Sequence, residues 1–297
     1  MRLNKRQKEV QRRLSKSERQ VLKELEQAYT SALDSVKEKI QILQSDEQTQ
    51  SKIYQLKYQQ QLEMQLTEIL NNLRYGSYET VQEYLEKCYK DSYAGVMYNL
   101  SNAGIPMTLP IDQEQMALVT GKTGDDFKLS KKIYNDVDTL KKTVQSEISR
   151  GIAAGMSYSE IARNIKDIGD VHLHNAQRIA RTEGHRVQEE SRYNAMVEAK
   201  ANGADIVKVW DATLDSNTRP EHRQLDGQVR EIDEPFTVGS YKAMKPGGFG
   251  VASMDINCRC CGLEMPRWAL DDTVTKMDNE TKALVTGTYD EFRRKYY

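Results

Sequence analysis

Residues 22–43, LKELEQAYTSALDSVKEKIQIL, contain the pattern that decides the fold. Their apolar side chains recur every three or four residues, which places them on one face of a helix. The members of this seam, with its continuation further along, are Leu22, Leu25, Tyr29, Ala32, Val36, Ile40, Leu43, Leu62, Leu66, Ile69 and Leu73. We expect two helices, or one long interrupted helix. Packing within the chain is favoured, although another copy or another protein would bury the same seam.

The N-terminal third has the composition of a helical region. Residues 1–101 are rich in Lys, Glu, Gln, Arg and Leu, which favour helices, and the first proline of the chain is Pro106. After the polar stretch 45–51 the apolar pattern resumes, and a further helix is expected over 77–101. We therefore treat 1–101 as a helical N-terminal region whose first turns are basic.

The pattern changes after this region. Residues 102–129 contain two prolines and three glycines, which predicts an irregular linker or arm. Further along, Ser157 and Glu160 have the spacing of a capping box, in which each side chain bonds the backbone N–H of the other residue. Helices are expected over 130–150, 158–166 and 170–202.

The C-terminal part is loop-rich and contains the first predicted strands. Residues 206–210 are mostly β-branched or aromatic and predict a strand, and shorter β-like runs follow at 228–232 and 236–238. We expect an α-dominated, α+β fold, in which the long helical N-terminal region precedes a small loop-rich α+β domain over 130–268 and a tail over 269–297.

Composition argues against a membrane protein. The chain has 43 basic and 44 acidic side chains, 38% hydrophobic residues and a mean hydropathy of −0.74. No stretch approaches 18 consecutive apolar residues, and the opening MRLNKRQKEVQRRL lacks the apolar segment of a signal peptide. We expect a protein that stays in the cytosol and has no membrane partner. Because the net charge is only −1, a nucleic-acid role would need a local basic patch.

Polar and cysteine side chains in the second half form the candidate structural motif. In chain order they are Arg181, Thr182, Glu183, Trp210, Arg219, His222, Asp226, Gly227, Cys258, Arg259 and Cys260. Thr218 and Glu221 have capping-box spacing, so residues 219–225 are expected to form one helical turn that fixes Arg219 and His222 in space.

A structural ion-pair network is the interpretation that we favour for the charged members of this motif. Arg181 and Glu183 lie two residues apart and leave a helix on different sides, so they cannot pair with each other. Their candidate partners are Arg219 and Arg259.

The order of these motifs over residues 120–266, with a helical lead-in at 151–157 and the sequence Leu225-Asp226-Gly227, resembles the phage Mu protein F-like family of minor head proteins. The resemblance covers about half of the chain. It implies a non-enzymatic, low-copy protein of the virion that lies in the capsid interior near the portal, and in the host cytoplasm during assembly. It also implies the portal protein and other head proteins as partners, and a role in head assembly and in DNA packaging or ejection. Cys261 and the Gly-rich insert at 242–253 depart from the family pattern.

A metal site would need four residues: His222, Cys258, Cys260 and Cys261. Structural zinc usually takes cysteine pairs with wider spacing than this cysteine run offers. A disulfide is disfavoured in a reducing cytosol and would leave Cys88 without a proper partner. We expect no metal and no cofactor, but a buried turn in which the cysteines act as small apolar residues and Arg259 bonds nearby carbonyl or carboxylate groups.

Motifs of catalysis are scarce. The sequence contains no phosphate-binding loop, nucleophile elbow or metalloprotease helix motif, and we predict no catalytic residue. His222 and Asp226 lie four residues apart, and a histidine with a carboxylate can act as an acid/base pair. The alternative is therefore a Mu F-like domain with ADP-ribosyltransferase-like or nuclease activity. His172 and His174 are interpreted as surface residues.

The basic N-terminus is the candidate DNA-binding segment. Its positive side chains, opposed only by Glu9 and Glu18, are Arg2, Lys5, Arg6, Lys8, Arg12, Arg13, Lys16 and Arg19. On a helix or an arm they would bind phage DNA through its phosphates, without reading bases and with a steep dependence on salt. The alternatives are a solvated helix face and a contact with an acidic portal surface.

Overall fold

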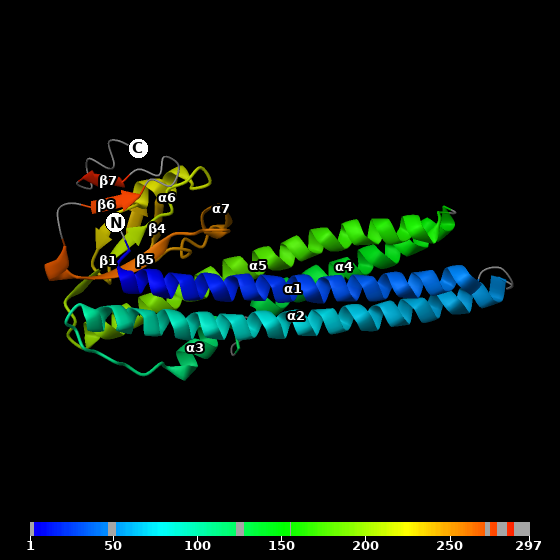
Figure 1. The fold of residues 1–297 in the computed structure, drawn as a ribbon, viewed down its shortest axis with the longest axis horizontal. Helices are drawn as coiled ribbons and strands as arrows, with labels where there is room; N and C mark the ends of the chain where they lie inside the picture. Colours follow the sequence, from blue (N-terminus) through cyan, green and yellow to red (C-terminus); the bar gives the residue numbers. More distant parts are fainter. Residues whose placement is uncertain are drawn as a thin grey trace. The chain divides into compact units, whose positions relative to one another are not determined.

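The computed structural model describes residues 3–46, 52–122, 128–154, 156–270, 274–277 and 284–287. Helices account for 69% of it, which confirms the α-dominated α+β class. In chain order (Figure 1) the described elements are α1 Lys5–Asp46, α2 Lys52–Asn102, α3 Gln113–Thr120, α4 Lys128–Ala153, α5 Tyr158–Ala201, β1 Ile206–Asp211, α6 Pro220–Leu225, β2 Val229–Arg230, β3 Phe236–Val238, β4 Tyr241–Ala243, α7 Ala252–Asp255, β5 Cys261–Pro266, the 3-10 helix Arg267–Ala269, β6 Val274–Met277 and β7 Leu284–Gly287.

The chain divides into two compact units that cut across the linear segments expected from the sequence. Unit 1 comprises Met1–Ser17, Leu85–Lys122 and Arg181–Tyr297, and unit 2 comprises Glu18–Tyr84 and Thr123–Ala180. The linear boundaries near residues 101, 129 and 268 stay predictions. We describe each unit by itself.

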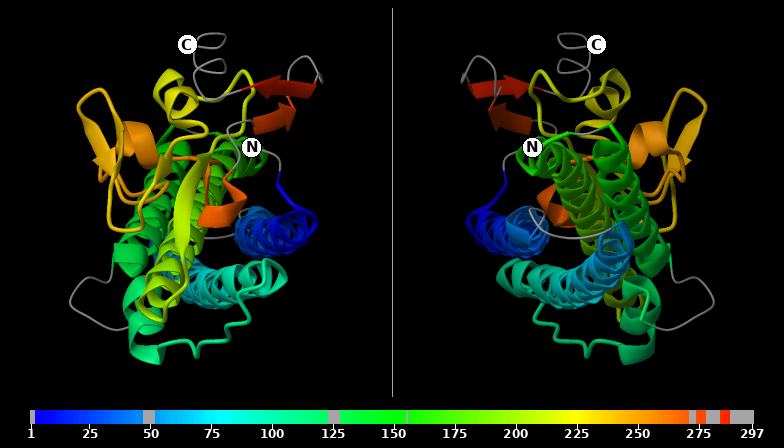
Figure 2. Two further views of the ribbon diagram at one scale, coloured as in Figure 1. Left: turned by 90° about the vertical axis from the view of Figure 1, so that its left-hand side faces the viewer. Right: turned by 90° about the vertical axis from the view of Figure 1, so that its right-hand side faces the viewer.

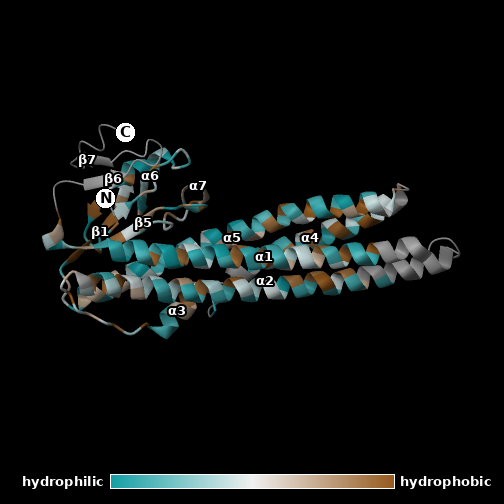
Figure 3. Ribbon diagram, viewed as in Figure 1, coloured by the Kyte–Doolittle hydropathy of each residue, from teal (hydrophilic) through white to brown (hydrophobic). Residues whose placement is uncertain are grey.

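Unit 2 is a bundle of helical segments from α1, α2, α4 and α5, which Figure 2 shows nearly end-on. Along each long helix hydrophobic and hydrophilic residues alternate (Figure 3). The seam on α1 is buried in one core with residues of the other three helices; the core includes Tyr29, Leu33, Val36, Ile40, Leu66, Leu70, Leu73, Leu140, Val144, Ile148, Ile161 and Ile165. The seam therefore packs within the chain, as expected. The side chains of Leu43 and Leu62 lie outside the described part of the structure.

Two of the expected helix boundaries are wrong, and the segment expected to be irregular contains a short helix. Helix α2 continues through Gly76, so 77–101 is not a separate helix. Helix α5 continues through Gly169, where a break was expected. The segment 102–129 contains α3, whose N-cap Asp112 accepts hydrogen bonds from the next turn. In the two long helices, burial of an apolar face outweighs the cost of one glycine.

The start of α5 forms the capping box that the sequence predicts. Ser157 donates its backbone N–H to Glu160 Oε2 at 2.9 Å, and Glu160 donates its own to Ser157 Oγ at 3.3 Å. One nearby expectation is wrong: His172 is buried, with Nδ1 2.9 Å from Asp136 Oδ1, whereas His174 is exposed as predicted. His172 lies on the face of α5 that packs in unit 2, so burial and a carboxylate partner go together.

The sheet of unit 1 is small and antiparallel, in the order β2-β1-β5. Strand β1 pairs with β5 over six positions, from Ile206 opposite Pro266 to Asp211 opposite Cys261. Strands β3 and β4 form a separate hairpin. The strands expected at 206–210, 228–232 and 236–238 correspond to β1, β2 and β3, although β2 covers only two residues.

An aromatic core supports the loops beside this sheet. The Trp210 side chain is fully buried, and its ring lies 5.1 Å from Phe236 and 5.8 Å from Phe249, centroid to centroid. Other buried members of the cluster are Ala212, Leu214, Leu225, Val238, Met254, Cys258 and Cys260. The two cysteines of the candidate motif therefore belong to this core.

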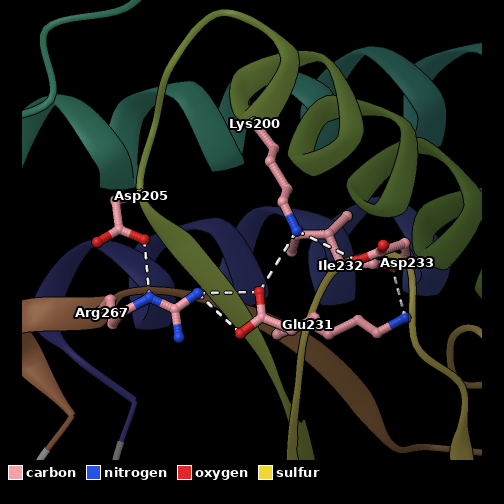
Figure 4. A network of polar contacts seen from close by, with 7 residues as sticks. Lys200, Asp205, Glu231, Ile232, Asp233 and Arg267 are labelled. Carbon is pink, nitrogen blue, oxygen red and sulfur yellow. Dashed lines mark hydrogen bonds and ion pairs between the residues drawn. The ribbon is translucent and has the colours of Figure 1, made fainter.

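A polar network closes the loop around Glu231 (Figure 4). Arg267 bonds both carboxylate oxygens of Glu231, at 2.7 and 2.9 Å, and also Asp205 at 2.8 Å. Lys200, near the end of α5, reaches Glu231 and Asp233. These surface ion pairs fix the ends of α5 and β5 to one loop. Because exposed ion pairs contribute little to the free energy of unfolding, their main effect is on the geometry of that loop.

Of the expected tail 269–297, the structure describes residues 269–270 and the paired strands β6 and β7. Arg2 of the basic segment and residues 123–127 of the expected linker also lie outside the described residues. Among the described helices, none has the length and apolar character needed to cross a membrane.

Candidate metal centre

His222, Cys258 and Cys260 meet in the interior of unit 1. His222 comes from α6, and the cysteines from the segment that leads into β5. The imidazole Nδ1 lies 3.2 Å from Cys260 Sγ and 3.6 Å from Cys258 Sγ, and the three side chains are 2–5% exposed. Both cysteines are free thiols. This is a cluster of three potential metal ligands assembled from segments 36 residues apart.

Helix α6 holds His222 in place. Pro220 provides a preformed first turn. Asp226, just beyond the helix, accepts the Ala212 N–H at 2.7 Å, and Gly227, at φ 77°, donates its N–H to the Trp210 carbonyl at 2.7 Å. The expected helical turn is therefore present and is tied to the end of β1.

The cap of this turn differs from the expectation. Thr218 does not cap α6: its hydroxyl contacts the Thr213 carbonyl and lies 3.0 Å from Asp215 Oδ1. A hydroxyl that bonds the preceding loop is no longer available to the helix N-terminus.

The cysteine segment is held from three sides. Arg219 donates to the Ile256 carbonyl at 2.5 Å, and His185 on α5 lies with Nε2 2.7 Å from the Cys260 carbonyl. Arg259 and Asp215 form a bidentate ion pair with both distances at 2.6 Å. Asn257, at φ 55°, makes the sharp turn before the first cysteine.

Arg219 and Arg259, the expected partners of Glu183, have other contacts. Glu183 is buried and accepts from Arg186 Nε at 2.8 Å, whereas Arg219 and Arg259 bind the two loops just described. Arg186, one turn along α5, is thus a partner of Glu183 that was not expected from the sequence, and the expected network stays a prediction.

Electrostatics separate the two thiols. The hydrogen bond from Cys260 and the contact with His222 lower the pKa of Cys258, while burial raises the pKa of Cys260 well above its usual value. Of the two thiols beside the His222 imidazole, the Cys258 thiol therefore loses its proton more readily than the Cys260 thiol.

Cys261, the fourth candidate ligand, lies in a different environment. It contacts Arg192, which pairs with Glu189 at 2.5 Å, and Gln11 Nε2 lies 3.2 Å from its sulfur. Glu189 also accepts the Gly262 N–H at 2.7 Å. Neighbouring residues of an extended segment face opposite sides, so Cys260 and Cys261 cannot belong to one ligand set here.

The His222 and Asp226 pair does not form an open acid/base site. Both side chains are buried, and the carboxylate is engaged by a backbone N–H. A cavity of about 530 Å³ lies nearby, but its lining contains no histidine, cysteine or carboxylate: Gln224, Gly227, Gln228, Val229, Arg230, Thr237, Val238 and Gly239. Among the described residues, no acid/base pair therefore faces this cavity.

Sequence reasoning missed the residues that support the cluster. His185, Thr213 and Asp215 carry no local motif, and only the fold brings them to the cysteine segment. The predicted members Arg181 and Thr182 lie on α5, exposed and half-buried respectively, outside the cluster.

Comparison with known proteins gives one family. Residues 142–262, which contain the His222 cluster, match the model of the phage Mu protein F like protein family. The "Minor head protein GP7" of Bacillus phage SPP1 is 38% identical over 122 residues, 41% of this chain and 39% of that protein. No solved structure matches.

A longer similarity is to the "NAD(+)--arginine ADP-ribosyltransferase EFV" of Enterococcus faecalis, which is 31% identical over 98% of this chain and 60% of that protein. An uncharacterised protein of Haemophilus influenzae is 28% identical over 48% of this chain and 28% of its own length. The chain thus spans less than two thirds of each of these relatives.

Proposed function

We propose that this chain is a non-enzymatic minor head protein of the phage Mu protein F-like family, which acts near the portal in head assembly and in DNA packaging or ejection. Residues 142–262 match the model of that family. The observation that carries the proposal is the family match, supported by the similarity to a phage minor head protein. Its partners are then the portal protein and other head proteins, and its place is the capsid interior of the virion.

The local structure fits a scaffolding role. Three residues of the candidate motif hold loops together by hydrogen bonds and ion pairs: Arg219, Arg259 and Asp226. The His222 cluster is buried in the core. A site that must bind and release a substrate needs an opening to solvent. This arrangement favours a rigid module that presents its surface to neighbours.

The first test is quantitative mass spectrometry of purified virions and of heads assembled without this protein. We expect a few copies per particle, with cross-links to the portal protein after treatment with a lysine-reactive reagent. Absence of the chain from virions would overturn the proposal, and cross-links confined to the major capsid shell would overturn its placement at the portal.

A second candidate function rests on the Enterococcus faecalis relative. That protein is named for the transfer of ADP-ribose to arginine, and this chain matches 60% of it. We propose that the named activity depends on the two fifths that the chain does not match. The purified chain is then expected to release no nicotinamide from NAD⁺ in the presence of an arginine acceptor. Release that is lost in His222→Ala, with the fold intact by circular dichroism, would establish the enzyme instead.

A further inference from the structure

We propose that His222, Cys258 and Cys260 bind one Zn²⁺ ion, which links helix α6 to the segment that leads into β5. The inference concerns this cluster alone and does not depend on the role in the phage head. It replaces the buried turn without metal that the sequence favours.

The geometry of the three donor atoms fits the ion. All lie within 4.8 Å of one another, and Nδ1 is 3.2 and 3.6 Å from the two sulfurs. Zinc bonds of about 2.3 Å to sulfur and about 2.05 Å to nitrogen, at tetrahedral angles, place a nitrogen and a sulfur about 3.6 Å apart. The side chains therefore need only small adjustments to receive the metal.

The chemistry of the donors selects the metal. Two cysteine sulfurs and an imidazole nitrogen form a soft set, which suits Zn²⁺ and excludes Mg²⁺ and Ca²⁺, ions that require oxygen ligands. Two thiolates also neutralise the charge of a divalent ion in a low-dielectric interior, where an unpaired charge would be costly.

Without a metal the same side chains are poorly satisfied. The hydrogen-bond contacts of the His222 ring are to two sulfurs, which are weak partners, and its Nε2 is buried with no hydrogen-bond partner among the described residues. Burial of an imidazole with so few strong hydrogen bonds is unfavourable. A coordinate bond at Nδ1 would replace the two weak contacts of that nitrogen with one strong bond.

The surroundings hold the ligands in position before any metal arrives. The Cys260 backbone is bonded by His185, and Arg259, between the two cysteines, is fixed by Asp215. The Trp210 and Phe249 rings flank His222 at 6.1 and 5.9 Å, centroid to centroid. A preorganised, mostly apolar shell of this kind limits the loss of side-chain freedom on binding.

The ion has a structural role. Three protein ligands leave the fourth tetrahedral position for a water molecule. The ligands are at most 5% exposed and the cavity described above does not open onto them, so a substrate has no path to the ion among the described residues. The link joins residues 36 positions apart in a unit with a small sheet. Metal binding then adds directly to the free energy of folding.

The test begins with the full-length wild-type chain, purified without a histidine tag and analysed for metals by inductively coupled plasma mass spectrometry. We expect about one zinc per chain. After removal of zinc with a chelator, titration with Co²⁺ alone should give intense visible bands and a sulfur-to-cobalt charge-transfer band, which report tetrahedral thiolate coordination. The melting temperature should fall on chelation and recover when Zn²⁺ is added.

The neighbouring cysteine gives a matched control. Cys258→Ser and Cys260→Ser are expected to lose the zinc and the cobalt spectrum, whereas Cys261→Ser and Cys88→Ser, which change equally buried cysteines, are expected to keep both. The wild-type spectrum needs no variant, so a failure of a variant to fold leaves the test intact. Wild-type protein that neither contains zinc nor binds Co²⁺ would overturn the proposal, as would loss of the metal in Cys261→Ser alone.

Discussion

Glu264 on β5 is a carboxyl group in the protein interior, 5% exposed, and its burial raises its pKa to about 7. The folded state therefore binds a proton more tightly than the unfolded chain, in which the value is about 4.5. Between these two pH values the folded state holds more protons, so the free energy of unfolding declines as the pH rises from about 4.5 to about 7.

Replacement of Glu264 by Gln should remove this part of the pH dependence. The wild type is expected to lose up to about 3 kcal/mol of stability between pH 5 and pH 8 from this group, since one pKa unit corresponds to about 1.4 kcal/mol. Urea unfolding at both pH values measures it, with exposed Glu83→Gln as the control. An equal slope in Glu264→Gln and wild type would contradict the assignment.

The hydrogen bond from His185 to the Cys260 carbonyl gives a second prediction at this scale. If the bond positions a zinc ligand, His185→Ala should weaken zinc binding roughly tenfold while the chain still takes up one ion in excess metal. Competition with a chromophoric chelator measures the affinity, and exposed His174→Ala is the control. Unchanged affinity would assign His185 a purely structural role.

Residue types were predictable from the sequence, but their grouping was not. His222, Cys258 and Cys260 stand out as possible ligands, yet they are distant in the chain, and the sequence offers Cys261 equally. Only the direction of the segment entering β5 decides that Cys260 faces His222 while Cys261 faces Arg192. His185 and Asp215 carry no signal because their roles depend on tertiary contacts alone.

Among the elements, the long helices show why glycine was a poor guide to the helix ends predicted from the sequence. Gly76 in α2 is exposed, and a methyl group added to its Cα would meet no atom within 4 Å. A methyl group added at Gly169 in α5 would instead overlap the side chain of Leu33. Gly76 therefore lowers the helix propensity of α2 without serving a packing contact. Gly169 allows close packing of α5 against α1, which composition and period do not reveal.

These two glycines give opposite predictions. Gly76→Ala is expected to stabilise the chain by about 0.5–1 kcal/mol through helix propensity, and Gly169→Ala to destabilise it by about 1–3 kcal/mol through overpacking against Leu33. Urea midpoints measure both. In the background of Leu33→Ala, Gly169→Ala should cost less; an unchanged cost in that background would contradict the packing argument.

For the whole molecule, net charge conceals a local excess. The chain has a net charge of −1, yet the described N-terminal helix exposes Lys5, Arg12, Arg13, Lys16 and Arg19. It is not a free arm, since Leu14 is buried and Arg6 stacks on Tyr98 at 4.2 Å. Deletion of residues 1–20 would therefore remove packed residues, and charge substitution is the cleaner probe of DNA contact.

Arg12→Gln with Lys16→Gln should weaken binding to double-stranded DNA and reduce the slope of log affinity against log salt by about 2, if both side chains bind phosphates. Fluorescence anisotropy at several salt concentrations measures the slope. The control pair Lys87→Gln with Lys131→Gln makes the same charge change elsewhere on exposed helix positions. Equal slopes in both pairs would remove the N-terminal helix as a DNA-binding segment.

The fold class followed from composition and period, but the division into units did not. Each unit collects segments that are distant in sequence, because the three longest helices contribute residues to both. A linear scan for loops places boundaries between helices and cannot detect a boundary inside one. Contacts between distant segments decide it.

The opposite orientations of Cys260 and Cys261 have a consequence for how this sequence can diverge. Substitutions at 258, 260 and 222 each remove one member of a shared set, so these positions should be kept or lost together among descendants of the chain. Position 261 should instead vary in step with 189 and 192. Two co-varying groups, separated by a single peptide bond, would then be visible in any deep collection of related sequences.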